Sequence, residues 1–403
     1  AGAVVATPVE EIVAFLALAQ QYIEHTLRAN RRSDNLYHAY NVLHLTHSRA
    51  AVSRLYEMLE GQVAILSSGL LSGAESLALL QGLRQSALYR ADQNTYILYP
   101  DRELPGFLER NCLTRDQVQS VKLLATLVDA GDSSIVTRDV DDVYHFNGRF
   151  RNFRDVSRVL ETLKSQPRYT ALVEADFSKV QALFEETFHH DQFTGRSGTF
   201  FAFEGLGSVY WHMVAKLLLA VQETVLRFKA EPFAPALIDH YLDIRQGLSF
   251  NKSPAAYGAF PTDPYSHTPK GQGAKQPGMT GLVKEIILTR LAEVGLSVKN
   301  GCLAFDPLLL DKGELLTAPT TFDYLDVSGQ PQRLELPAGS LAATFCQTPI
   351  ILRVEGAPGI RVHFNDGTAK EVAGLLLDAA TSRQLFQREG AIHHLEVTCP
   401  VSA

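Results

Sequence analysis

The sequence predicts a mainly α-helical protein: an (α/α) toroid-type helical domain over residues 1–295, then a small antiparallel, β-sandwich-like domain over residues 296–403. Three observations lead to this prediction. Apolar residues recur at helical spacing in the first part, elaborate loops separate these stripes, and after Gly295 short alternating runs with tight-turn dipeptides take over. Fewer helices are recognisable than a closed six-hairpin toroid needs. We therefore expect a missing N-terminal portion or a second chain to complete it.

Helix ends in the first part are marked by capping residues. Residues 7–10 form a capping box, with Thr7 as N-cap, ahead of an apolar stripe over residues 12–27. A second box over residues 114–117 precedes another stripe. The clearest helix is predicted directly after the glycine-rich stretch that ends at residue 207. A further helix is predicted to stop at Gly295, because glycine suits a helix C-cap.

Turn dipeptides divide the C-terminal part into short strands. Asn300-Gly301 is predicted to close one hairpin and Ser328-Gly329 a second. Another turn follows the run 360–364, and the run 392–398 is expected to form the last strand.

Composition excludes several classes of protein. The chain has 403 residues, of which 46% are hydrophobic, and a net charge of −7. The apolar fraction argues against disorder, and the negative charge argues against a nucleic-acid partner. No apolar run is long enough to span a membrane, and the first one lacks the basic flank of a signal peptide. The compartment stays open, with the cytoplasm favoured.

The sequence predicts neither a metal site nor a bound cofactor. The four cysteines are scattered without CxxC spacing and are predicted to be free thiols. The pair His189-His190 lacks the i, i+4 spacing with which a helix binds a metal ion. The glycine and serine motifs of NTPases, dinucleotide enzymes and serine hydrolases are absent from the sequence.

Three connections, residues 89–111, 188–211 and 250–280, are too long and too polar to be mere linkers, and long loops in compact domains are usually functional. The last one holds five prolines, which rigidify a loop before it binds a ligand. Its candidate hydroxyl-binding side chains are Asp263, Tyr265, His267 and Gln276. The alternative is a loop that only covers one end of the helical body.

The middle connection combines glycines with hydrogen-bond donors. Arg196, Ser197 and Ser208 suit a sugar or an anion near the start of the following helix. Trp211, the only tryptophan of the chain, is predicted to stack on a sugar ring. The alternative is that the glycines shape a tight turn and the aromatic residues fill the core.

Two further segments place a carboxylate among arginine, tyrosine and amide side chains. Asp34 lies in the first, and Asp92 lies in the second between Arg90 and Gln93. Such a composition is typical of sugar-cleaving sites, where planar polar groups bind hydroxyls and one acid protonates the leaving oxygen. A solvated helix end with a salt bridge has the same composition.

Several of these runs resemble a known group of proteins. Residues 89–111, 194–223 and 241–285, with the β-rich tail from Phe322, resemble the C-terminal part of large bacterial proteins that are cellobiose-phosphorylase-like. More distantly, the run Gly-Leu-Gly-Ser-Val-Tyr-Trp at 205–211 is similar to the glycine- and serine-rich stretch of the inverting glycoside phosphorylases.

The resemblance implies a toroid fold, a carbohydrate substrate and one aspartate as general acid upstream of the glycine-serine stretch. Its order along the chain points to Asp34 as that acid, with Asp92 and Glu204 as the alternatives. Inorganic phosphate is then an expected co-substrate, and an oligosaccharide or glycoside is the expected partner.

Two functions are therefore weighed. The first is an enzyme that cleaves or phosphorolyses a glycosidic bond with inversion, with an acid whose pKa is raised by burial. The second is a non-catalytic carbohydrate-binding or scaffolding portion of a larger protein. A third possibility is that the loops serve only assembly with a missing portion.

Overall fold

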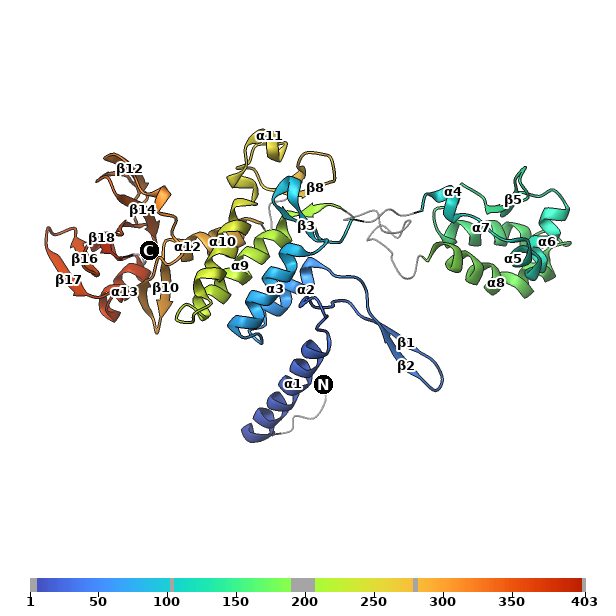
Figure 1. Cartoon of the computed structure of the whole chain (residues 1–403), viewed down its shortest axis with the longest axis horizontal. Helices are drawn as coiled ribbons and strands as arrows, with labels where there is room; N and C mark the ends of the chain where they lie inside the picture. The colour runs from blue at the N-terminus through green and yellow to red at the C-terminus, as the bar shows by residue number, and fades with distance from the viewer. Residues whose placement is uncertain (1–5, 102–104, 190–206, 278–281, 401–403) are drawn as a thin grey trace.

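A computed structural model describes residues 6–101, 105–189, 207–277 and 282–400 (Figure 1). The buried residues form three separate hydrophobic cores. We call the parts built on them the body (6–101, 207–277 and 282–293), the inserted unit (105–189) and the C-terminal unit (294–400). The first core takes residues from both sides of the inserted unit, so the body folds from segments far apart in the sequence.

The body is organised around one central helix, α9 (Trp211–Arg227). Eleven of its 17 residues are buried, and it packs on α2, α10 and α12. A helix that is apolar on most of its surface must lie inside a core. The other helices of the body are α1 (Val9–Ala29), α2 (Leu59–Ser67), α3 (Gly73–Gln85), α10 (Ala234–Gln246), α11 (Pro254–Tyr257) and α12 (Leu282–Glu293).

Within the described residues, seven short strands lie in the connections between the helices of the body. They pair as two hairpins and one three-stranded sheet. Their bounds are β1 (Val42–Leu45), β2 (Ala50–Ser53), β3 (Tyr89–Arg90), β4 (Thr95–Tyr96), β7 (Val209–Tyr210), β8 (Tyr265–Thr268) and β9 (Lys275–Pro277). A 3₁₀ turn over Ala91–Gln93 joins β3 to β4, and another covers Ser249–Asn251.

The inserted unit has a core of its own, made from residues 113–188 alone. Its ends meet, because Phe107 stacks on Phe188 with ring centroids 6.0 Å apart. Asp176 is buried, and its carboxylate accepts a hydrogen bond from the backbone N–H of Leu123. Asp176 therefore caps the start of the helix Lys122–Asp129. Its elements are α4 (Phe107–Arg110), α5 (Arg115–Ser120), α6 (Lys122–Asp129), β5 (Val136–Arg138), β6 (Tyr144–Phe146), α7 (Phe153–Lys164) and α8 (Thr170–Phe188).

The C-terminal unit contains two hairpins and a five-stranded sheet in the order β14-β15-β18-β16-β17. In that sheet β15 and β18 run parallel, while the other neighbours are antiparallel. The elements are β10 (Leu296–Lys299), β11 (Cys302–Phe305), β12 (Thr320–Leu325), β13 (Pro331–Leu336), β14 (Ser340–Phe345), β15 (Thr348–Arg353), β16 (Gly359–Phe364), β17 (Ala369–Ala373), α13 (Ala379–Gln387) and β18 (Ile392–Thr398), with a 3₁₀ turn at Lys312–Glu314.

A buried charge network joins the body to the C-terminal unit. Glu293, at the end of α12, pairs with Arg245 at 2.8 Å and with Arg290 at 2.9 Å. Both arginines also pair with Glu314, which lies beyond the hairpin β10–β11. Tyr241 donates a 2.6 Å hydrogen bond to Glu293. The network therefore ties α10 and α12 to the start of the C-terminal unit.

Helix α1 forms where the apolar stripe predicts it, but the stripe is not part of the core. Phe15 is 68% exposed and Ile23 60%, and no residue of the helix is buried. Figure 1 shows α1 projecting from the body, and the exposed hairpin β1–β2 projects in another direction. The N-cap is Pro8 and not Thr7, and no side chain caps the helix, so the predicted capping box is wrong. None of the helices in the described ranges is long and apolar enough to cross a membrane.

The predicted fold class, a mainly-α toroid followed by an antiparallel β domain, is wrong. Of the described residues 42% are helical and 22% lie in strands, distributed over many small sheets and one mixed sheet. A toroid needs successive helix pairs around one core, whereas α5 to α8 pack on a core of their own. The hairpin β16–β17 and helix α13 lie between β15 and β18, which gives the chain the crossover that a parallel pair requires. The domain boundary between residues 295 and 296 stays a prediction.

Candidate functional site

A three-stranded sheet brings the glycine-rich and the proline-rich connections together. Val209 and Tyr210 on β7 pair with Thr268 and His267 on β8. Strand β8 then pairs with β9, where His267 lies opposite Lys275. The two loops that the sequence marks as functional therefore share one sheet. We call this region, with residues 89–101 beside it, the β7–β9 site.

Arg90 ties three segments of this site to one another. Its guanidinium donates to the carbonyl oxygens of Gly207 and Thr268 at 3.3 and 3.4 Å. It also forms a two-pronged ion pair with Asp92, with N···O distances of 2.9 and 3.1 Å. Only 11% of the Arg90 side chain is exposed. Its geometry is that of a residue that positions the loops, because its donors are already occupied by the protein.

The inserted unit leaves and rejoins the body at this site. Gly207 has a φ of +63°, and a β-carbon added there would lie 2.9 Å from a carboxylate oxygen of Asp101. Leu98 donates from its backbone to the carbonyl oxygen of Ser208 at 3.2 Å. Asp101 in turn pairs with Lys270 of the proline-rich loop. The two points of attachment, before residue 102 and after residue 206, are thus held against each other at the β7–β9 site.

Trp211 does not offer its ring to a ligand. It is fully buried, donates a 2.9 Å hydrogen bond to the Thr268 hydroxyl, and packs edge-on against Tyr257 at 5.3 Å. This burial does not favour the prediction that Trp211 stacks on a sugar ring, and it favours the alternative, an aromatic residue that fills the core. The site is built on this tryptophan, which anchors β8 to the start of α9.

Half-buried aromatic and imidazole rings lie next to it. Tyr210 stacks on His267 with ring centroids 4.9 Å apart and an angle of 16° between the rings. The Tyr210 hydroxyl lies 2.9 Å from Nδ1 of His212. Ser266 lies 2.8 Å from Nδ1 of His267 and bonds Gln276 at 3.3 Å. A flat aromatic face bordered by hydroxyl, imidazole and amide groups suits a sugar ring and its hydroxyls.

Three buried polar atoms near this sheet have no hydrogen-bond partner among the described residues: Oε1 of Gln93, Nε2 of His212 and Oε2 of Glu285. Buried polar groups are nearly always paired, so unpaired ones mark positions for a water or a ligand. Burial lowers the pKa of His212, against the opposing effect of the Glu285 carboxylate. The imidazole is therefore neutral at pH 7 and offers one acceptor or donor.

Sequence reasoning missed Glu285 and Lys252. Glu285 is only 4% exposed and lies on the buried face of α12 with Thr289 and Glu293, whereas Val283 and Ile287 of the apolar stripe are exposed. Lys252 donates to the carbonyl oxygen of Gln93 and lies 5.9 Å over the Trp211 ring, and burial lowers the pKa of its amine. The apolar stripe points away from Glu285, so helical spacing gives no signal that marks this residue. Lys252 follows a 3₁₀ turn and carries no such signal either.

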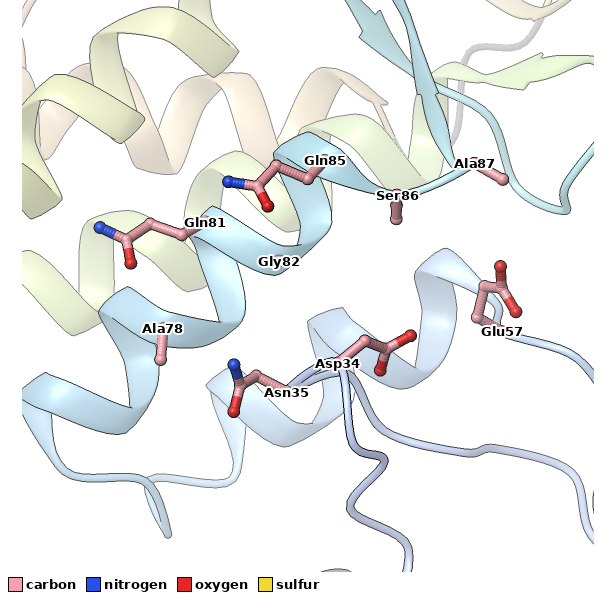
Figure 2. Close-up of a pocket in the computed structure, with 9 residues that line it drawn as sticks. All are labelled: Asp34, Asn35, Glu57, Ala78, Gln81, Gly82, Gln85, Ser86 and Ala87. Atoms are coloured by element: carbon pink, nitrogen blue, oxygen red, sulfur yellow. The ribbon is translucent and has the colours of Figure 1, made fainter.

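Asp34 lies elsewhere, in a hollow of about 480 Å³ between its loop and helix α3. Figure 2 shows Asp34 and Glu57 on one side of the hollow and the α3 side chains Gln81 and Gln85 on the other. A β-carbon on Gly82 would lie 2.5 Å from the Asp34 carbonyl oxygen, so glycine lets the loop approach the helix. None of the described residues that line this hollow belongs to the β7–β9 site.

The expected rise in the pKa of Asp34 is contradicted by its surroundings. The Arg32 guanidinium, 2.8 Å from the carboxylate, lowers the pKa of Asp34. Arg32 also contacts Glu57 at 3.3 Å. An aspartate held in this way is ionised at neutral pH, whereas a general acid must carry its proton. Asp34 as the acid stays a prediction that this geometry does not favour.

The remaining predicted site residues differ in how exposed their side chains are. Asp263 and Gln276 are exposed, Tyr265 is half-buried and Ser208 is buried. The Ser208 hydroxyl lies 3.4 Å from the carbonyl oxygen of the next residue. Three candidates lie outside the described residues: Arg196, Ser197 and Glu204. The structure thus brings Arg90, Asp92, Gln93, Ser208, Tyr265 and His267 to neighbouring elements, and leaves Asp34 apart.

Comparison with known families places one part of the chain. Residues 104–191 match the family model described as "GH149 phosphorylase insertion domain 2". This range coincides with the inserted unit, which spans 105–189 in the structure. No curated protein matches the chain. The inserted unit, which begins and ends at the β7–β9 site, is therefore similar to an insertion domain of phosphorylases.

Proposed function

We propose that this chain binds an oligosaccharide at the β7–β9 site and takes part in its cleavage by phosphate, as a portion of an inverting glycoside phosphorylase. The observation that carries the proposal is the position of the inserted unit. It is similar to an insertion domain of phosphorylases, and both of its attachment points lie against the residues that hold this site together. Connections between elements often carry the residues of binding and catalytic sites, and here they carry the insertion as well.

In the proposed reaction a phosphate oxygen attacks the anomeric carbon from one face while the glycosidic C–O bond breaks on the other. A carboxylic acid gives its proton to the leaving oxygen, and the products are a sugar 1-phosphate of inverted configuration and a shortened glycan. Tyr210 and His267 offer the sugar a flat face, and Arg196 and Ser197 are proposed to hold the phosphate.

Glu285 joins Asp92 and Glu204 as a candidate for the acid. It is buried, and one of its oxygens has no hydrogen-bond partner among the described residues, so that oxygen is placed to contact a ligand. Asp92 is less suited, because its side chain is 62% exposed and paired with Arg90. Glu285 lies close enough to His212 to oppose the lowering of the His212 pKa by burial.

A second candidate function, glycan binding without chemistry, is favoured by a specific observation. Asp34 and Asp92, the two predicted acids that the structure describes, are each held by an arginine. In this case the partner is the glycan alone, and a further portion or a second chain supplies the acid.

One experiment separates the two. The chain is incubated with a panel of gluco-oligosaccharides, with and without inorganic phosphate, and the products are separated by chromatography. We expect a sugar 1-phosphate only when phosphate is present. Glu285→Gln should slow its formation by about 10²–10⁴-fold, and the exposed Glu223→Gln on α9 should leave it unchanged. Binding by calorimetry without any product supports the second function, and neither binding nor product overturns both.

A further inference from the structure

Two histidines and a glutamate lie together in the C-terminal unit, on a face of the five-stranded sheet. His363 on β16 is directly opposite His394 on the antiparallel strand β18. Glu396 follows His394 by two residues, so both point to the same face of the sheet. The imidazoles of His363 and His394 stack at 4.1 Å with an angle of 8° between the rings. Backbone pairing therefore fixes the positions of all three side chains.

The spacing of their donor atoms fits one metal ion. Nε2 of His363 lies 3.7 Å, and Nε2 of His394 3.8 Å, from the same carboxylate oxygen of Glu396. All three ligand atoms lie within 4.8 Å of one another. Bonds of about 2.1 Å to a tetrahedral zinc ion place neighbouring ligand atoms about 3.4 Å apart. The two distances to Glu396 exceed that value by about 0.3–0.4 Å, and rotation of the side chains would bring the ligand atoms closer around an ion.

The donor atoms are also available. Nε2 of His363 is buried and has no hydrogen-bond partner among the described residues. His394 contacts His393 through Nδ1, at 2.7 Å, which leaves Nε2 facing Glu396 and fixes the ring. Arg361, which is opposite Glu396 in the strand register, forms its ion pair with Glu371 on β17, at 3.3 Å. A second contact at Nδ1 is the arrangement that orients ligating histidines.

We propose that His363, His394 and Glu396 bind a divalent transition-metal ion of the Zn²⁺ class, with water in the fourth position. Imidazole and carboxylate are borderline-to-hard ligands of the kind that zinc takes in three-ligand sites. The ion would cross-link β16 to β18, and so brace the strand that also pairs in parallel with β15. The proposal is independent of the β7–β9 site.

The test is a titration of the whole chain, without a polyhistidine tag, with zinc chloride by calorimetry. We expect one ion per chain, and His363→Ala and Glu396→Gln should each weaken its binding at least about tenfold. Glu389→Gln, which removes an exposed carboxylate of the same unit away from these three residues, is the control and should bind as the wild type. Cobalt(II) should give the intense visible absorption of a tetrahedral site in the wild type and lose it in His363→Ala.

Circular dichroism of each variant keeps the test interpretable, since all three side chains are partly exposed and their replacement should leave the fold intact. A folded wild type that binds no zinc overturns the proposal. Zinc binding that the His363 and Glu396 replacements leave unchanged overturns it as well, because the ion would then lie elsewhere.

Discussion

Replacing Glu293 by alanine should lower the free energy of unfolding by about 3–5 kcal/mol. Glu293 and Glu314 each pair with both Arg245 and Arg290, so the replacement removes one of two shared carboxylates and leaves the two arginines with Glu314 alone. It also takes the acceptor from the Tyr241 hydroxyl. A buried charge that loses its partner keeps its desolvation cost without compensation. The effect should be large because Glu293 is only 3% exposed.

Urea unfolding followed by tryptophan fluorescence measures this effect, since the single tryptophan lies in the core of the body. The matched control is Asp306→Ala, which breaks a more exposed ion pair to Lys229 between the same two parts and should cost less than about 1 kcal/mol. Equal losses in the two variants would show that burial of the network contributes nothing.

The same network predicts how stability depends on pH. Burial works against ionisation of Glu314, but the hydrogen bonds from Arg290 and Arg245 outweigh it and lower the pKa of Glu314 from its ordinary value of 4.5. A lowered pKa in the folded state stabilises the fold above the unfolded pKa. This contribution is lost as the pH falls below about 4.5 and through the folded pKa of Glu314. Replacing Glu314 by glutamine should flatten that part of the profile.

Trp211→Ala should destabilise the protein by about 3–5 kcal/mol, the usual cost of removing a large buried aromatic side chain. Trp211 is completely buried and joins α9 to β8 through its bond to Thr268. Because β8 carries His267, the same replacement should also abolish glycan binding at the β7–β9 site. Circular dichroism during urea unfolding gives the stability, and calorimetry gives the binding.

Phe260→Ala is the control for Trp211. Phe260 lies in the proline-rich loop but is 72% exposed, so its loss should change the stability by no more than about 0.5 kcal/mol. Trp211→Phe should recover part of the loss, because it refills the core without the hydrogen bond. A Trp211→Ala variant as stable as the wild type would contradict the claim that Trp211 anchors β8 to the start of α9.

Local signals in the sequence predicted individual elements well. The hairpin at Asn300-Gly301 forms as predicted, and both residues have positive φ, as such a turn requires. Gly295 follows α12 with a φ of +81°. The box at 114–117 caps α5 as expected. Each of these signals acts over a few residues, so the surrounding fold does not alter it.

The arrangement of the elements could not be predicted in the same way. Helical spacing shows that a helix has an apolar face but not which core receives it, so α7 and α8 were assigned to a toroid although they build a unit of their own. The apolar face of α1 is exposed for the same reason: periodicity does not show whether a partner is present. Strands β14 and β15 were missed because β15 is an apolar run without alternation, as in strands buried on both faces.

In the candidate site, too, the sequence predicted the residues that take part but not how they are arranged. The composition of the loops singled out Arg90, His267 and the segment around Ser208, and the structure places them on adjacent elements. Composition does not show whether a ring is accessible, so Trp211 was assigned to a ligand and not to the core. Nor does it show ion pairing, which decides the charge of Asp34.

Hydrogen exchange of the whole chain, with and without phosphate and a gluco-oligosaccharide that binds in calorimetry, tests the central claim most directly. We expect slower exchange at the backbone amides of residues 207–212 and 264–277, where β7, β8 and β9 meet, and no change around Asp34 and the face of α3 opposite it. Protection confined to the hollow beside α3, or to the inserted unit, would contradict the assignment of the ligand to the β7–β9 site.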